Sequence, residues 1–219
     1  MNLFIDIETI PDQREDALAR AKGLVKVPAN YKKPEAIEKF RDEHAAEAHA
    51  KTALKGLYGE VCSIAWAIDD DEVHAVTRTH EMHESELLDL FMAAVSEGIN
   101  ASQGGYPSIT WIGHNVIDFD LRFLKQRALI NNVRPPFLIP ADARHGNKAF
   151  DTMKEWAGWR GYVKLDELCE AFGFPGKNDV DGSMVGLLWA NKEYEVINQY
   201  NKDDVDMVRN VYSRMTWKS

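Results

Sequence analysis

Residues 2–12, NLFIDIETIPD, place two carboxylates in a segment that otherwise has the pattern of a buried strand. Apolar side chains recur at every second position, which is the period of a β-strand, and Pro11 ends the segment. The two acids, Asp6 and Glu8, share one face of this strand. Because a buried charge without a partner is costly, something else in the fold must neutralise them. This strand therefore constrains which segments can pack against it.

Strand-like and helical segments alternate along the rest of the chain. Residues of high β propensity predict strands in VCSIAWAI, VHAVTR and SITWIGHN and a short strand in KAFDTM. Apolar spacings of three and four predict helices over about residues 85–98, 118–130, 165–172, 185–189 and 194–215. The stretch from Ser102 to Pro107 is expected to be a loop. No repeat interrupts this order, so we predict one α/β domain over residues 1–219.

Residues 13–58 form a polar stretch of helical character between the first two predicted strands. Pro34 suits the first turn of a helix and Gly56 suits a helix end. We interpret residues 13–58 as a helical insertion or a lid rather than as part of the core.

Composition limits the function and the location. The formal net charge of −9 argues against a protein that binds nucleic acid by charge alone, but it is compatible with a local basic groove. Cys62 and Cys169 stand in apolar periodic segments, which favours buried thiols and a reducing compartment. The chain has neither a signal-like start nor an apolar run long enough to cross a bilayer. We therefore expect a soluble cytoplasmic protein without a membrane partner.

A third acid, Asp204, lies in the apolar stripe of the last predicted helix. Steps of three and four along this stripe pass through Tyr200 and reach Asp204, so these two side chains share one face. Asp203 and Asp206 point in other directions around the helix and are expected to be solvated.

A fourth acid, Asp120, stands where GHNVIDFDLRFL passes from a strand into a helix. Asp118 is placed to cap that helix, whereas Asp120, in its first turn, can point back toward the end of the sheet. Asp118 remains an alternative to Asp120 as a metal ligand.

Four acids in one apolar space cannot all stay ionised without a counter-charge. Two like charges about 4 Å apart repel by roughly 4 kcal/mol at an effective dielectric constant near 20. Oxygen ligands without convergent cysteines or histidines favour Mg²⁺ or Mn²⁺ over Zn²⁺. Two such ions would activate a water and stabilise a leaving oxygen during displacement at phosphorus. The pattern thus indicates phosphodiester hydrolysis.

Three motifs in this order resemble a known family. FIDIET supplies Asp-x-Glu, HNVIDFD supplies Asn-x(4)-Asp, and YNKDD supplies Tyr-x(3)-Asp. Together they resemble the DEDD 3′-5′ exonucleases, in particular their tyrosine subgroup, DEDDy. The closest resemblance is to stand-alone bacterial and phage exonucleases related to the proofreading domain of family B DNA polymerases, and KLDELCEAFGFPGK and DGSMV also resemble that group. Gln199 stands where the sister subgroup has a histidine, which favours the tyrosine mechanism.

The resemblance implies a ribonuclease H-like fold whose central mixed sheet of about five strands is flanked by helices. It implies that Asp6 bridges two ions, Mg²⁺ or Mn²⁺, and that Glu8 and Asp204 complete the site that holds the catalytic water. Asp120 would hold the second ion, partly through water, and Tyr200 would orient the attacking water. The residues implied near the substrate are Thr9 and Ile10, through their main chain, and His114, Asn115 and Phe119.

We therefore interpret the chain as a metal-dependent 3′-5′ exonuclease that shortens single-stranded or frayed DNA. The resemblance connects such an activity with DNA repair and proofreading, but no polymerase motif accompanies it, so proofreading in cis is not expected. One alternative is a 3′-5′ exoribonuclease, because carboxylate ligands do not report on a 2′-hydroxyl. The others are a catalytically silent nucleic-acid-binding adaptor with the same fold and a carboxylate cluster stabilised by calcium. The sequence assigns no protein partner.

Histidines and a further aspartate have structural interpretations. His74, His80 and His83 fit no compact zinc motif and are expected to be solvated. His114 can contact substrate or can bond to a backbone carbonyl. Asp151 is expected to cap a helix or to brace the sheet.

Aromatic and basic residues of the second half have two interpretations each. Trp156, Trp159 and Tyr162 are expected to pack in the core or at its rim, with stacking on bases as the alternative. A basic group can hold phosphates beside the metal site or merely solubilise the surface. Its members are Arg122, Lys125, Arg127, Arg134, Arg144, Lys148, Arg160 and Lys164.

Overall fold

The computed structural model describes residues 1–101, 108–146, 148–176 and 181–217. Two predicted features fall outside these ranges, namely the loop from Ser102 to Pro107 and the last residue of KLDELCEAFGFPGK. Within the described ranges, no helix combines the length and the apolar character needed to span a membrane.

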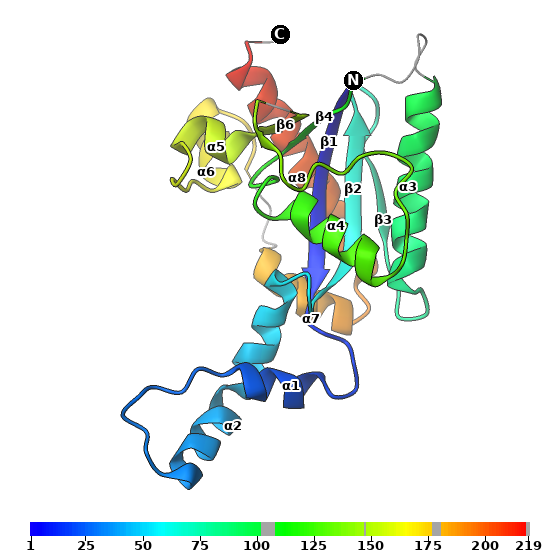
Figure 1. Cartoon of the computed structure of the whole chain (residues 1–219). Coiled ribbons are helices and arrows are strands. Elements are labelled where there is room, and N and C mark those ends of the chain that lie inside the picture. The colour runs from blue at the N-terminus through cyan, green and yellow to red at the C-terminus, as the bar shows by residue number, and fades with distance from the viewer. Residues whose placement is uncertain (102–107, 147, 177–180, 218–219) are drawn as a thin grey trace.

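A mixed six-stranded sheet forms the centre of the molecule (Figure 1). The strands are β1 (Asn2–Ile10), β2 (Glu60–Ile68), β3 (His74–Thr77), β4 (Thr110–Gly113), β5 (Arg144–His145) and β6 (Lys148–Asp151). They lie in the order β3-β2-β1-β4-β6-β5, with β1 antiparallel to β2 and parallel to β4. The expected mixed sheet is therefore present, and the strand beyond the expected five is the two-residue β5.

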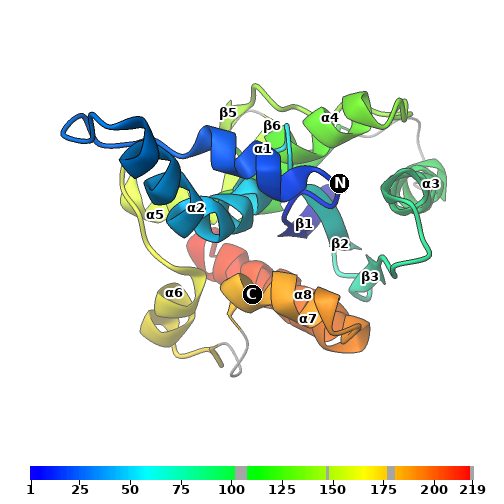
Figure 2. The same cartoon turned by 90° about the horizontal axis from the view of Figure 1, so that it is seen from below.

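Helices cover both faces of this sheet. The helical elements are α1 (Ala17–Leu24), α2 (Pro34–Ala50), η1 (Lys51–Leu54), α3 (Glu84–Ala101), α4 (Asp120–Ile130), α5 (Thr152–Ala157), α6 (Leu165–Phe172), η2 (Gly182–Met184), α7 (Val185–Ala190) and α8 (Tyr194–Met215). Buried residues of α3 and α4 share one apolar cluster, and those of α6 and α8 share another. Figure 2 shows α4 and α8 on opposite sides of the strands.

The side chains of β1 alternate between these two clusters. Its odd-numbered apolar residues pack with α3 and α4, whereas Phe4 packs with α8. Asp6 and Glu8 follow Phe4 on the same face, because side chains two residues apart on a strand point the same way. The alternation thus directs both acids toward the helix that carries Asp204.

The insertion after β1 contains α1, α2 and η1 and projects beyond the end of the sheet (Figure 1). We call residues 13–58 the helical arm. Its base is fixed to β1 and the residues that follow, because the Thr9 hydroxyl donates to the Ala53 carbonyl (2.8 Å) and the Asp12 N–H donates to the Thr52 hydroxyl (2.9 Å). Within the arm, Lys22 of α1 forms ion pairs with acids of α2.

Candidate active site

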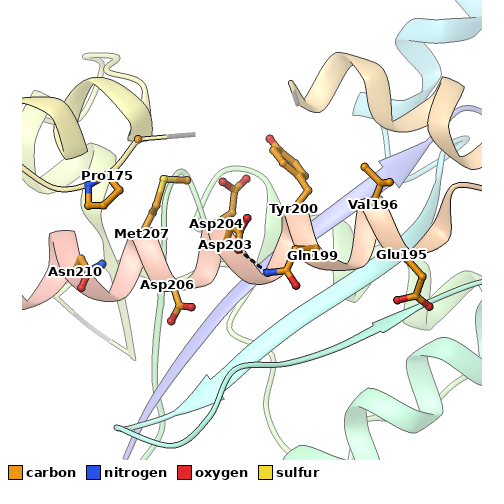
Figure 3. A pocket seen from close by; sticks show the side chains of 11 residues that line it. Pro175, Glu195, Val196, Gln199, Tyr200, Asp203, Asp204, Asp206, Met207 and Asn210 are labelled. Atoms are coloured by element: carbon orange, nitrogen blue, oxygen red, sulfur yellow. Dashed lines mark hydrogen bonds between the residues drawn. The ribbon is translucent and has the colours of Figure 1, made fainter. Parts of the chain in front are cut away.

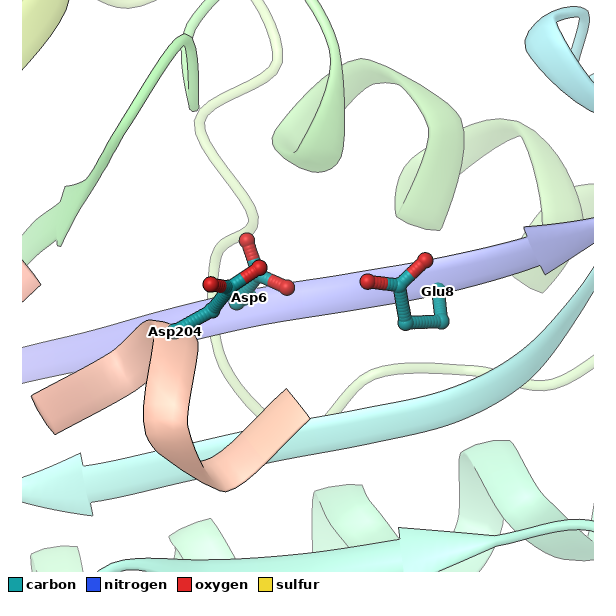
Figure 4. Close-up of side chains that lie close together, drawn as sticks. All are labelled: Asp6, Glu8 and Asp204. Atoms are coloured by element: carbon teal, nitrogen blue, oxygen red, sulfur yellow. The ribbon is translucent and has the colours of Figure 1, made fainter. Parts of the chain in front are cut away.

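Three carboxylates meet where the middle of β1 passes α8 (Figure 4). They belong to Asp6, Glu8 and Asp204, and one oxygen of each lies within 4.8 Å of the others. Glu8 is 9% exposed and Asp204 is 5% exposed. The strand period and the helix stripe therefore bring together three of the four acids that the sequence singled out.

The chemistry of this cluster fits a hard divalent cation. Within the described ranges the cluster consists of carboxylates alone, without cysteine or histidine. Carboxylate oxygens at this spacing repel one another. A cation bound between them attracts each carboxylate and offsets this repulsion. Oxygen donors are the ligands that Mg²⁺ and Mn²⁺ prefer.

Asp120, the fourth acid, begins α4 next to the cluster. One of its carboxylate oxygens accepts a hydrogen bond from the Ile7 N–H (3.1 Å), and the side chain is almost fully buried. Burial raises the pKa of Asp120 from 3.8 to about 7, and the charges of Asp151 and Asp204 add to this rise. The charge of Asp204 therefore raises the pKa of Asp120. Asp120 is nevertheless not one of the three acids whose carboxylate oxygens lie within 4.8 Å of one another.

Tyr200 lies one turn before Asp204 on α8 and is 7% exposed. Burial raises the pKa of Tyr200 far above its ordinary value of 10, and the charges of Glu8, Asp204 and Asp6 raise it further. The phenol therefore remains protonated and can donate a hydrogen bond. Gln199 is exposed on another side of α8, and its side-chain amide donates to Asp203 (2.7 Å; Figure 3).

A pocket of about 680 Å³ opens along α8 beside Tyr200 and Asp204 (Figure 3). Its lining residues are Pro175, Gly176, Glu195, Val196, Gln199, Tyr200, Asp203, Asp204, Asp206, Met207 and Asn210. It gives a ligand access from solvent to the buried end of the Asp204 side chain. The sequence pattern of α8 alone does not predict this pocket. The other wall of the pocket is formed by Pro175 and Gly176, which lie next to α8 only in the folded protein.

Asp151 holds the loop between β4 and α4, which carries Asn115 and leads to Asp120. Asp151 is fully buried, and its carboxylate accepts hydrogen bonds from the N–H groups of Asn115 (3.0 Å) and Ile117 (3.1 Å). It also accepts two N–H bonds from the first turn of α5. The prediction that Asp151 caps a helix or braces the sheet is confirmed. Asn115 itself has a φ of +60°, a conformation that asparagine tolerates better than most residues.

Two of the residues expected near the substrate have partners within the protein. The ring nitrogens of His114 contact the Thr152 hydroxyl and the Val163 carbonyl, each at 2.9 Å. Of the two interpretations of His114, these contacts favour the one in which it bonds to a backbone carbonyl. Phe119 packs against Phe123, with ring centroids 5.4 Å apart.

The end of β1 presents backbone rather than side chains. A bulge between Glu8 and Thr9 shifts the pairing of β1 with β2. The Thr9 hydroxyl donates a hydrogen bond to the Ala53 carbonyl of the helical arm, and the Ile10 side chain is fully buried.

Asp118 does not cap α4, so that prediction is wrong. The helix has no side-chain cap, and the Asp118 carboxylate pairs with the Lys154 ammonium (2.6 Å). The Asp118 side chain is 50% exposed, whereas that of Lys154 is 5% exposed. A buried lysine requires a counter-charge, and Asp118 provides it.

The predicted basic group contains one member that cannot hold phosphate. Arg127 is buried and forms an ion pair with Glu84 (2.6 Å), which is also buried. The other seven members are exposed. The ion pair could not be predicted from sequence spacing, because Glu84 and Arg127 lie on different helices, α3 and α4.

The two thiols and the three histidines of residues 74–83 are expected to be buried and solvated, respectively. Cys62 and Cys169 are buried thiols, as predicted, and burial raises the pKa of Cys62 well above 9.0. His74 and His83 are exposed as expected. His80 is exposed too, but its ring also stacks on Trp189 at 3.9 Å.

A comparison with solved structures agrees with this fold. The family B DNA polymerase of the hyperthermophilic archaeon Pyrobaculum calidifontis superimposes on the chain with a TM-score of 0.60 at 16% sequence identity. The match covers 98% of this chain but only 24% of the polymerase chain. The chain therefore has the ribonuclease H-like fold of a polymerase exonuclease domain. A search of curated protein sequences gives no significant match.

A family model supplies the identification. The family of predicted 3′-5′ exonucleases related to the exonuclease domain of PolB matches residues 52–218, more than half of the chain, and the chain belongs to this family. Asp120, Tyr200 and Asp204 fall within the matched residues. Asp6 and Glu8 precede them, and it is the structure that brings these two acids to Asp204.

Proposed function

We propose that the protein is a metal-dependent 3′-5′ exonuclease that removes nucleotides from single-stranded DNA ends. The observation that carries this proposal is the convergence of Asp6, Glu8 and Asp204 within 4.8 Å. The family description supports the 3′-5′ direction, and its relation to a DNA polymerase domain supports DNA as the substrate.

The carboxylates have distinct proposed roles. Asp6, Glu8 and Asp204 would hold the ions, and Asp120 would contribute a fourth carboxylate beside them. When bound, two divalent ions would activate a water and neutralise the charge that develops at the phosphate. The protein positions the ligands on rigid elements, because β1 sets the first two acids at alternate residues and α8 sets the third.

Tyr200 would orient the attacking water. Its phenol is protonated at neutral pH for the reasons given above, so it can donate a hydrogen bond to a water beside Asp204. Its place on the wall of the pocket lets it meet a ligand that enters there. Tyr200→Phe should therefore lower turnover and leave metal binding nearly intact.

End-labelled single-stranded DNA tests the proposal. With Mg²⁺, a 3′-labelled oligonucleotide should release labelled mononucleotide at once, and a 5′-labelled one should shorten stepwise. Asp204→Asn should lower the rate about 10³-fold, because it removes several kcal/mol of charge stabilisation. Asp89→Asn is the control, since Asp89 is an exposed aspartate on α3, outside both the acidic cluster and the pocket.

Three outcomes decide against parts of the proposal. Equal rates for the Asp89 and Asp204 variants would show that the acidic cluster does not catalyse the cleavage. Faster digestion of a matched RNA strand would assign the enzyme to RNA. Binding of oligonucleotides without any cleavage in Mg²⁺ or Mn²⁺ would favour the adaptor.

A further inference from the structure

Large aromatic side chains are exposed at the end of α5 and in the segment that leads to α6. Trp156 is 56% exposed, Trp159 is 67% exposed and Tyr162 is 74% exposed, so of the two expected placements, core or rim, the core is excluded for all three. Trp156 packs edge-on against Phe172, at 5.5 Å between ring centroids, and belongs to the rim. Exposed apolar groups gathered in one segment are uncommon on monomeric proteins and often mark a binding surface.

The shape of this segment is fixed by two glycines. Gly158 has a φ of +77° and a ψ of −177°, a conformation that side-chain-bearing residues rarely adopt. A Cβ added at Gly161 would lie 2.0 Å from the Ala157 carbonyl oxygen, so the chain there folds tightly back on itself. We call residues 158–163 the aromatic loop. Its two exposed rings are presented by a closely folded backbone.

The aromatic loop is connected to the acidic site through the segment that leads to Asp120. Lys154 pairs with Asp118, two residues before Asp120, and its ammonium lies 5.1 Å from the centroid of the Trp159 ring. At the other end of the loop, the Val163 carbonyl contacts the His114 ring. The Val163 end of the loop therefore contacts the β4–α4 connection directly, and the Trp159 end is linked to it through Lys154.

The aromatic loop and the residue after it carry cations that can meet a polyanion. Arg160 and Lys164 are exposed, and residues 156–165 contain no acid, although Glu155 precedes and Asp166 and Glu167 follow this stretch. Aromatic side chains interleaved with cations are the combination that holds single-stranded nucleic acids, because bases stack on the rings while phosphates meet the cations.

We propose that Trp159 and Tyr162 form a stacking site for the bases of a single strand whose 3′ end lies at the acidic cluster. This inference rests on the proposed exonuclease function and adds to it a means of selecting the substrate. Stacking tolerates any base, since every base has a π-face, but it requires that the faces be uncovered. Bases within a duplex are covered, so the aromatic loop selects unpaired strands.

Binding in the presence of EDTA tests the site without cleavage. The probes are a 12-nucleotide oligothymidylate and an abasic strand of the same length and charge, titrated against tryptophan fluorescence. Oligothymidylate should quench the fluorescence, and Trp159→Ala should weaken its binding roughly 10-fold. Trp159→Phe should restore most of the affinity. The abasic strand should bind weakly and equally to the wild type and to Trp159→Ala.

Leu90→Ala is the control. Leu90 is 51% exposed on α3, which lies on the opposite side of the molecule from α5 and α6 (Figure 2). Its removal should leave the affinity for oligothymidylate unchanged. Equal affinity of the wild type and Trp159→Ala, equal loss in the Trp159 and Leu90 variants, or equal binding of the abasic strand would each overturn the stacking site.

Hydrolysis of the p-nitrophenyl ester of thymidine 5′-monophosphate separates this inference from the proposed function. This substrate has a single nucleotide and lacks the further bases that would stack on the aromatic loop, so Trp159→Ala should cleave it at the wild-type rate with Mg²⁺. A large loss of this activity would show that Trp159 acts on the acidic site and not on the strand. If the wild type cleaves neither ester nor oligonucleotide, the exonuclease proposal fails, whereas the EDTA titrations still decide the stacking site.

Discussion

Asp120 should make the metal-free protein less stable as the pH rises. Burial raises the pKa of Asp120 from 3.8 to about 7, so the folded protein binds this proton more tightly than the unfolded chain does. The resulting stabilisation is complete below pH 4 and is lost as the pH rises through 7. A difference of about 3 pH units, at about 1.4 kcal/mol for each, corresponds to up to about 4 kcal/mol.

Asp120→Asn isolates this contribution, because asparagine resembles the protonated acid and its oxygen can still accept the Ile7 N–H bond. In EDTA, urea unfolding should give equal free energies for the variant and the wild type near pH 4. At pH 8 the variant should be more stable by up to about 4 kcal/mol.

Asp118→Asn provides a control of opposite sign. It removes the counter-charge of buried Lys154 and should cost about 1 kcal/mol, because the amide oxygen still accepts a hydrogen bond. If the stability difference between Asp120→Asn and the wild type does not change with pH, or if the variant is the less stable protein at pH 8, the assigned proton on Asp120 is wrong.

Three further predictions concern the metal site and the core. Mg²⁺ at 100 times its dissociation constant should stabilise the wild type by about 2.7 kcal/mol and Asp204→Asn by much less, and thermal melts that Mg²⁺ leaves unchanged would count against the cluster. Asp151→Asn weakens four backbone hydrogen bonds and should cost about 2–4 kcal/mol in urea unfolding, with a lower exonuclease rate, whereas full stability would contradict its bracing role. Glu84→Gln leaves Arg127 buried without a counter-charge and should cost about 3–5 kcal/mol, and an unchanged melt would contradict that assignment.

Periodic patterns explain how much of the site could be predicted from sequence. Asp6 and Glu8 stand two residues apart on a strand, and Tyr200 and Asp204 stand four apart on a helix. These spacings determine on which face of the strand or helix each polar side chain lies relative to its apolar neighbours. They therefore also determine which side chains point into the space between β1 and α8. The same reasoning predicted α8 over Tyr194–Met215, its observed bounds.

Features that depend on contacts between segments far apart in the sequence could not be predicted in this way. The pairing of Asp118 with Lys154 and the burial of Arg127 against Glu84 join segments whose relation appears only after the helices pack. The two-residue β5 is too short to show a strand period. Exposure of Trp159 depends on the course of its loop, which carries no periodicity.

The base of the helical arm has a practical consequence. The N–H of Asp12 and the hydroxyl of Thr52 are hydrogen-bonded, so the chain leaves the sheet and returns to it at almost the same point. Lengthening a loop whose ends already meet costs little closure entropy. This junction is therefore suited to grafting, and a fluorescent or affinity module could replace the segment between α1 and α2 without disturbing the strands.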